Sequence, residues 1–204
     1  MHEEVLSEDQ HKLLPLLKSF RDDFGLIRGT AMALEIGHRR SIDFDLATFS
    51  EFNARQIRDR IGNTIKIDAV LVDETYEYTL VVNEVKLTFL HYPFNFEFGE
   101  NYNDIINLPD EITLSALKAY ALGRRAKWKD YVDLYFVISR NSFKDVVQRA
   151  KFIFKEEFNE KLFREQLAYF EDIDYSEKID YLQGFSTSED VIKSKLTQYS
   201  LEKP

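Results

Sequence analysis

The sequence contains no cysteine, and this absence removes several kinds of chemistry at once. Without thiols, the chain cannot form disulfides, bind zinc or iron–sulfur clusters through thiolates, or use a cysteine nucleophile. Nothing in the sequence therefore requires an oxidising compartment.

Long apolar runs and a basic-then-apolar leader are missing as well. The first ten residues carry four acids, and no apolar stretch approaches the length needed to cross a bilayer. Internal repeats and low-complexity segments are also absent. We therefore expect a cytoplasmic protein without membrane contact.

Positive charge is scarce, because 27 Lys and Arg residues against 36 Asp and Glu residues leave a net charge of -9. Non-specific affinity for nucleic acid comes from neutralising phosphates, so this balance excludes a nucleic-acid coat. The deficit is uneven: residues 1–107 carry a net charge of -8 and residues 108–204 of -1. Residues 114–129 form an acid-free basic stretch, so an RNA contact would have to be local.

The spacing of apolar residues predicts two parts of different character in a chain of 204 residues that is 44% hydrophobic. For the first part it predicts helices over residues 7–23, 31–36 and 52–61, and strands over residues 24–27, 41–47, 64–72, 76–82 and 85–92. For the second part it predicts helices over residues 114–122, 128–138, 143–158 and 159–170. We therefore predict an α+β fold, with an N-terminal mixed β-sheet domain (1–107) followed by a C-terminal helical domain (108–204).

Two acids two residues apart are the first chemical signal. Asp43 and Asp45 share one face of a predicted strand, and two adjacent carboxylates with substrate phosphates are ligands that Mg²⁺ accepts. Alone, such a pair is more typical of a solvated strand face. Gly29 and Thr30, where a strand turns into a helix, add a place for an anion, although a plain helix start capped by Thr30 is the simpler reading. Together the two features form the combination that phosphoryl transfer needs.

At these positions the sequence resembles a known family. Residues 28–45 read Arg-Gly-Thr-Ala-Met-Ala-Leu-Glu-Ile-Gly-His-Arg-Arg-Ser-Ile-Asp-Phe-Asp. This stretch is similar to the leading motif of the nucleotidyltransferase AbiEii/AbiGii toxin family, in the DNA polymerase beta-like nucleotidyltransferase superfamily. Residues 85–93 and 117–135 match the family's later motifs in the right order. The resemblance implies that the N-terminal sheet is of the nucleotidyltransferase type.

The resemblance also implies roles for individual residues. Gly29 and Thr30 would cradle a triphosphate, and Asp43 and Asp45 would bind Mg²⁺, with Mn²⁺ as an alternative ion. Lys118 would contact phosphate in the transition state, although a Lys on an amphipathic helix often only snorkels. The remaining candidates are one further active-site acid, Asp130, and four nucleotide contacts, Arg40, Ser41, Lys86 and Arg125.

Two departures from the family pattern affect the site. Arg28 replaces the first Gly of the usual Gly-Gly-Thr, which adds charge beside the phosphate turn and would either assist or restrict triphosphate binding. The third carboxylate of the superfamily is not evident, and Asp68 or Asp130 are candidates for it. For Arg39 and Arg40, pairing with Asp43 or another local acid, which would orient the loop, is as good an interpretation as direct nucleotide contact. We expect Asp133 to be mainly structural.

The resemblance implies an enzyme that moves a nucleoside monophosphate from an NTP to an acceptor hydroxyl and releases pyrophosphate. Its role would be the toxin of a bacterial toxin–antitoxin or phage-defence pair, with RNA such as tRNA, or a protein, as acceptor and a cognate antitoxin as partner. The alternatives are a catalytically inactive nucleotide-binding module, a metal-dependent phosphohydrolase and a partner-binding scaffold.

Overall fold

The computed structural model describes residues 1–122, 124 and 126–202 and divides into two compact units. The first unit comprises Met1–Glu35 and Arg40–Asp110, and the second comprises Ile36–Arg39 and the chain from Glu111 onward. The sequence-based domains, 1–107 and 108–204, stay a prediction, and the units differ from them mainly in placing Ile36–Arg39 with the C-terminal helices.

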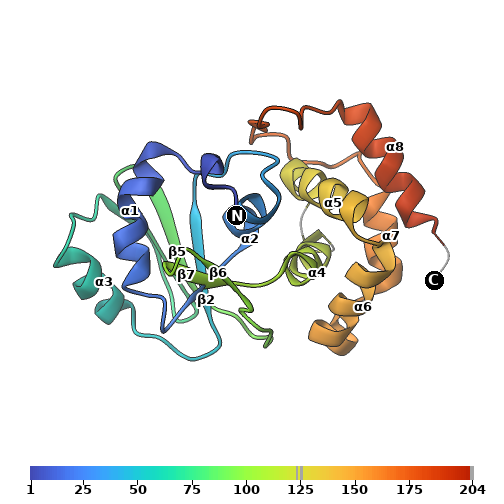
Figure 1. Ribbon diagram of the computed structural model, residues 1–204. Coiled ribbons are helices and arrows are strands. Elements are labelled where there is room, and N and C mark those ends of the chain that lie inside the picture. The colour runs from blue at the N-terminus through green and yellow to red at the C-terminus, as the bar shows by residue number, and fades with distance from the viewer. Residues whose placement is uncertain (123, 125, 203–204) are drawn as a thin grey trace. The chain divides into compact units, whose positions relative to one another are not determined.

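In the part of the chain that the structure describes, a mixed five-stranded sheet of order β1-β2-β5-β4-β3 forms the centre of the first unit (Figure 1). β2 and β5 pair in parallel, and the other neighbours pair antiparallel, which confirms the predicted α+β fold. The strands are β1 (Gly25–Ile27), β2 (Phe44–Thr48), β3 (Ala69–Asp73), β4 (Glu77–Val82) and β5 (Val85–His91). The helices are η1 (Glu3–Val5), α1 (Glu8–Lys18), α2 (Arg28–Ile36) and α3 (Ala54–Gly62).

The start of α1 shows how local sequence sets an element boundary. Ser7 accepts a hydrogen bond from the backbone N–H of Gln10, and the Gln10 side chain accepts one from the backbone N–H of Ser7, at 3.2 and 2.9 Å. This reciprocal pair is a capping box, which satisfies N–H groups that have no partner inside the helix.

Two predicted strands begin later than expected. The strand predicted over residues 41–47 starts at Phe44, because the backbone of residues 41–43 bonds to the N-terminal segment and to Thr30 instead of to a strand. The strand predicted over residues 64–72 starts at Ala69, since the N–H groups of Thr64 and Ile65 bond back to Ile61 at the end of α3.

A two-stranded hairpin, β6 (Glu100–Tyr102) with β7 (Ile106–Leu108), lies where the sequence predicted no regular element. Its turn places Asn103 and Asp104 at φ 48 and 57, a left-handed conformation that Asn and Asp adopt more readily than most residues. Strands of three residues are too short to show alternation, which is why the pattern missed them.

The second unit is built mainly from helices in its described residues, with an irregular segment between α7 and α8 (Figure 1). These helices are α4 (Glu111–Leu122), α5 (Trp128–Arg140), α6 (Phe143–Phe154), η2 (Lys155–Glu157), α7 (Glu160–Leu167) and α8 (Glu189–Ser200). The helix predicted over residues 143–158 is divided, because Lys155 at φ 49 ends α6. α8 was not predicted. No helix among the described residues is long and apolar enough to cross a membrane.

A buried charged cluster, which we call the Asp133 cluster, lies inside the second unit and comprises His38, Arg39, Lys118, Asp130 and Asp133. Asp133 Oδ1 accepts hydrogen bonds from His38 Nε2 and Arg39 Nε, both at 2.7 Å. Asp133 Oδ2 accepts one from Arg39 Nη2 at 2.8 Å and lies 2.7 Å from Lys118 Nζ, which is 2.5 Å from Asp130. Two cations and two carboxylates therefore neutralise one another out of water.

The cluster sets the charge state of its members. Burial alone would raise the pKa of Asp133, but the charges of Arg39 and Lys118, with the hydrogen bonds from His38 and Arg39, hold that pKa well below its usual range. Burial lowers the pKa of His38 more than Asp133 raises it, so the ring is neutral at pH 7 and its Nε2–H donates to Asp133.

We expect Asp133→Asn to lower the free energy of unfolding by about 3–5 kcal/mol, because it leaves Arg39 and Lys118 buried without a full counter-charge. Urea denaturation measures this loss. The matched control is Asp190→Asn on the exposed first turn of α8, with an expected loss below about 1 kcal/mol. Equal losses in the two variants would contradict the structural importance of the cluster.

Candidate active site

Two carboxylates lie where β2 begins in the first unit. Asp43 immediately precedes the strand, and Asp45 is its second residue. Asp43 Oδ2 lies 2.8 Å from Lys86 Nζ on the parallel neighbour β5, and Asp45 Oδ1 lies 2.9 Å from Arg28 Nη1. Both carboxylates therefore occupy positions in which they already stabilise a cation.

The donor set fits Mg²⁺, which takes hard oxygen ligands and is held in proteins by one or two carboxylates plus substrate phosphates. Among the described residues, no group of three or more His, Cys, Asp or Glu side chains is arranged to hold a metal ion. Asp68, a candidate third carboxylate, instead accepts a hydrogen bond from the backbone N–H of Asn83 at 2.7 Å. Asp130, the other candidate, belongs to the Asp133 cluster of the second unit.

The backbone carbonyl of Asp43 is held from two sides. The Thr30 hydroxyl donates to it and lies 2.8 Å from the Ser41 hydroxyl. The side-chain amide of Gln10 donates to the same carbonyl at 3.3 Å, and Gln10 is fully buried. The side chain of Thr30 thus fixes the loop before β2, which leaves only its backbone N–H for an anion.

Arg28 connects β1 to α2 without an intervening turn and has φ 63, in the left-handed region. A side chain in this region costs about 1–2 kcal/mol relative to the right-handed one, and Gly avoids this cost. The change from strand to helix expected at Gly29 and Thr30 therefore occurs one residue earlier, at Arg28 in its left-handed conformation, and both expected residues lie inside α2.

Arg40 and Ser41, two predicted nucleotide contacts, are fastened to the N-terminal segment. Arg40 Nη1 donates to the carbonyl of Glu4, and the Ser41 N–H donates to the carbonyl of Val5, both at 3.2 Å. Arg39 pairs with an acid, as one alternative had it, but the acid is Asp133 of the Asp133 cluster.

Lys118 and Asp130, the candidate catalytic residues of the second unit, contact each other in the Asp133 cluster. Lys118 is 4% exposed and Asp130 is fully buried, so Lys118 does not snorkel. The structure brings this pair together, and it brings Asp43, Asp45, Lys86 and Thr30 together in the first unit. Arg125 lies outside the described residues.

The basic stretch of residues 114–129 carries less free charge than its sequence suggests. Lys127 Nζ lies 2.7 Å from Glu177, and Lys129 pairs with the same carboxylate. Burial raises the pKa of Glu177, but the hydrogen bonds and charges of these two lysines lower it by more. The pKa that results is about 2. Arg124 stacks on Tyr120 with its guanidinium 3.7 Å from the ring centroid. The case for an RNA contact on this stretch is correspondingly weaker.

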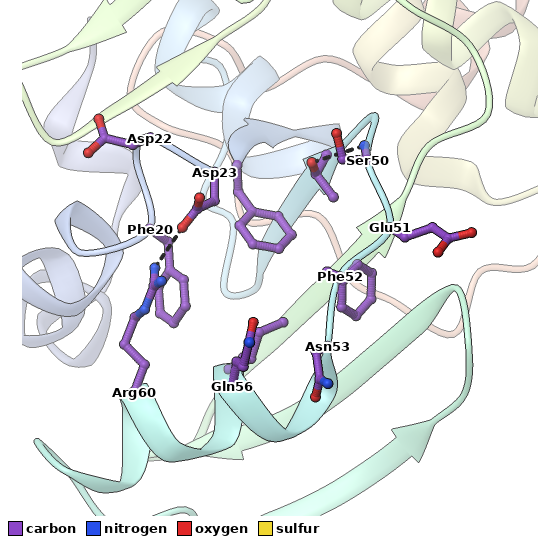
Figure 2. Close-up of a pocket in the computed structure, with 12 residues that line it drawn as sticks. Phe20, Asp22, Asp23, Ser50, Glu51, Phe52, Asn53, Gln56 and Arg60 are labelled. Atoms are coloured by element: carbon purple, nitrogen blue, oxygen red, sulfur yellow. Dashed lines mark hydrogen bonds and ion pairs between the residues drawn. The ribbon is translucent and has the colours of Figure 1, made fainter.

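A pocket of about 290 Å³ opens elsewhere in the first unit (Figure 2). Phe20 and Phe52 form part of its wall, and Arg60 reaches Asp23 at 2.9 Å, as the dashed line shows. None of the predicted site residues lines this pocket, so this pocket and the candidate site predicted from the sequence lie in different places.

Sequence reasoning missed Gln10 and the pairing of Arg28 with Asp45. The Ser7-x-x-Gln10 spacing is that of a capping box, which gives no sign that the Gln10 amide also reaches Asp43, 33 residues later. Arg28 was noticed as a departure from the family pattern, and only the fold shows which acid it meets.

Known proteins resemble this chain in sequence and in fold. It is 27% identical over 202 residues to the uncharacterized protein aq_aa25 of Aquifex aeolicus (strain VF5), covering 95% of this chain and 97% of that protein. Its fold matches MenT4, the nucleotidyltransferase toxin Rv2826c of Mycobacterium tuberculosis H37Rv, with a TM-score of 0.60, 13% identity, and coverage of 95% of this chain and 81% of that chain. It also matches JHP933 of Helicobacter pylori, with a TM-score of 0.50, 20% identity, and coverage of 80% and 74%.

No protein-family model matches the sequence. What the comparisons establish is therefore the fold, which is one that nucleotidyltransferases of known structure share. The narrower resemblance to the AbiEii/AbiGii family stays a prediction.

We expect Gln10→Met to lower the free energy of unfolding by about 1–3 kcal/mol, because it removes one half of the capping box and leaves the Asp43 carbonyl with one donor fewer. Ser7→Ala is the matched control, since it disrupts the same cap without touching Asp43, and costs about 1 kcal/mol. Urea denaturation compares the two variants. A loss for Gln10→Met no larger than that for Ser7→Ala would contradict the bond to Asp43.

The contribution of Glu177 to stability should depend on pH. Its pKa falls from 4.5 in the unfolded chain to about 2 in the folded one, so its stabilising effect is present above pH 4.5 and declines as the pH falls towards 2. The melting temperatures of wild type and Glu177→Gln should therefore differ most at pH 7 and converge below pH 4.5. The exposed Glu171 provides the control, Glu171→Gln, for which no such convergence is expected.

Proposed function

We propose that this protein is a Mg²⁺-dependent nucleotidyltransferase that moves a nucleoside monophosphate from an NTP to an acceptor hydroxyl. The observation that carries the proposal is the carboxylate pair Asp43 and Asp45 at the start of β2, each already facing a cation, on a fold shared with MenT4. Two carboxylates that hold cations side by side are suited to a divalent ion that also binds phosphate.

The chemistry would be an in-line displacement at the α-phosphorus. A bond forms between the acceptor oxygen and this phosphorus, the bond to the bridging oxygen breaks, pyrophosphate leaves and the hydroxyl proton passes to solvent. Mg²⁺, or Mn²⁺, held by Asp43 and Asp45 would supply charge neutralisation for the triphosphate and the attacking oxygen. The chain itself would position these groups, with the backbone N–H groups of Gly29 and Thr30 at the start of α2 binding phosphate oxygens.

The other predicted residues take subsidiary roles in this proposal. Lys86, next to Asp43, is a basic side chain of the first unit that would meet a phosphate. Arg40 and Ser41 are proposed as nucleotide contacts. In the free protein they bond to the carbonyl groups of Glu4 and Val5. Arg125 is retained as a nucleotide contact on the resemblance alone.

Lys118 and Asp130 are proposed as a further basic residue and a further acid of the same reaction. Their burial and mutual pairing mean that substitutions here will also affect folding. Any loss of activity in Lys118 or Asp130 variants therefore has to be compared with a thermal melt of the same variant.

The biological role we propose is that of a toxin paired with a cognate antitoxin, in the AbiEii/AbiGii branch. The resemblance of residues 28–45 supports the branch, and the fold shared with MenT4, a nucleotidyltransferase toxin, supports the role. RNA such as tRNA, or a protein, is the proposed acceptor.

A second candidate function is a nucleotide-binding module without transfer activity. The specific observation in its favour is that the described residues provide two carboxylates but no cluster of three metal-ligating side chains. Such a module would bind NTP with Mg²⁺ and leave the α-phosphorus unreacted.

The test supplies each of the four NTPs, labelled on the α-phosphate, with Mg²⁺ and either bulk tRNA or a protein mixture as acceptor. Label should appear on one acceptor with release of pyrophosphate. Asp43→Asn and Asp45→Asn should each reduce this transfer by at least about 100-fold, since even outer-shell changes at metal sites cost 10–100-fold.

The matched control is Asp59→Asn on the exposed face of α3, which should retain transfer. Release of inorganic phosphate in place of pyrophosphate would contradict the proposal and support a phosphohydrolase. Nucleotide binding without label transfer, unchanged in Asp43→Asn, would favour the binding module.

A further inference from the structure

The two candidate metal-binding carboxylates each have their own counter-ion within the first unit. Asp43 meets the ammonium of Lys86 at 2.8 Å, and Asp45 meets the guanidinium of Arg28 at 2.9 Å. The four side chains together carry no net charge. A divalent ion arriving alone would therefore meet a site that is already neutralised.

The two carboxylates and the two cations differ in their access to solvent. The side chains of Asp43 and Asp45 are 25% and 14% exposed, whereas those of Lys86 and Arg28 are 41% and 38% exposed. The carboxylates are fixed by the loop and the strand that carry them, while the cations sit at the ends of long side chains with room to reorient. The cations are thus the partners that can leave.

The position of Arg28 also places it at the anion-binding end of a helix. It is the first residue of α2, its backbone is in the left-handed conformation, and its side chain donates to Asp45. A triphosphate bound by the N–H groups of the first turn of α2 would lie within the same neighbourhood as this guanidinium. Guanidinium and phosphate form strong, bidentate hydrogen bonds.

From these contacts we infer that Arg28 and Lys86 are exchangeable counter-ions that make the site specific for a metal ion bound together with a triphosphate. In the free protein they neutralise Asp45 and Asp43. When the triphosphate enters, they move onto its oxygens and release the carboxylates for the divalent ion. This inference rests on the proposed function, because it assigns Asp43 and Asp45 to the metal ion.

The exchange predicts opposite effects on two kinds of metal binding. Two ion pairs that only stabilised the fold would not produce them. Removing either cation frees a carboxylate, so the metal ion alone should bind more tightly. The same removal deletes a phosphate ligand, so the metal ion with triphosphate should bind more weakly. Unfolding or loosening of the site would weaken both kinds of binding.

The experiment measures binding and does not depend on turnover. Free Mn²⁺ is followed by electron paramagnetic resonance, with and without inorganic tripolyphosphate, which needs no knowledge of the preferred base. The variants are Arg28→Gly, which also suits the left-handed backbone, and Lys86→Met. Lys66→Met, on an exposed residue of the same unit, controls for the general effect of removing a positive charge.

We expect Arg28→Gly and Lys86→Met each to tighten Mn²⁺ binding about tenfold without tripolyphosphate and to weaken binding of Mn²⁺ with tripolyphosphate about tenfold. Arg28→Lys, which keeps the charge, should lie between Arg28→Gly and wild type in both measurements. Lys66→Met should match wild type.

Changes of the same sign in both measurements, no change in either, or an equal effect of Lys66→Met would overturn the inference. The proposed function fails separately. If opposite shifts are seen but no NTP gives label transfer, the exchange stands and the transferase does not. If transfer occurs without opposite shifts, only the exchange is wrong.

Discussion

The hydrogen bonds to the backbone carbonyl of Asp43 hold together the part of the first unit on which the proposed chemistry depends. Thr30 approaches this carbonyl from α2 and Gln10 from α1, so two helices and the start of β2 meet at one oxygen atom. Because the carbonyl is committed to these donors, the strand cannot start earlier, and the carboxylate of the same residue has a defined position beside β5. The geometry of the carboxylate pair thus follows from a backbone contact.

Both units neutralise charge internally, but with different solvent access. In the second unit the Asp133 cluster is buried, and removing one charged member leaves its partner as an unpaired buried charge. In the first unit the cations on Asp43 and Asp45 are partly exposed, and in the exchange proposed above they are replaced by the metal ion. One arrangement favours a unique folded state, while the other favours binding. The comparison explains why similar ion pairs support a structural reading for Asp133 and a functional one for Asp45.

The sequence predicted those helices and strands whose formation depends on neighbouring residues in the chain. The helix predicted over residues 7–23, which the structure has at residues 8–18, and the strands that became β4 and β5 follow from capping, periodicity and β-branched residues. The fold class follows from their order. The later start of β2 and the hairpin of β6 and β7 could not be predicted, because distant partners and left-handed residues decide them. Within the candidate site, residue types pointed to Asp43 and Asp45 as candidates, but the partners Lys86 and Arg28 depend on which strands and helices become neighbours.

The four residues Ile36–Arg39 have a consequence for how the gene can be divided. They belong to the helical unit by their contacts, although the residues on either side belong to the sheet unit, so the chain leaves the sheet unit and returns to it before its final departure. A cut near residue 107 would give one fragment with His38 and Arg39 but without Asp133, and another with Lys118 and Asp133 but without Arg39. Each fragment would contain only part of the charged cluster and would leave charged groups without their partners. We therefore expect neither fragment to fold independently.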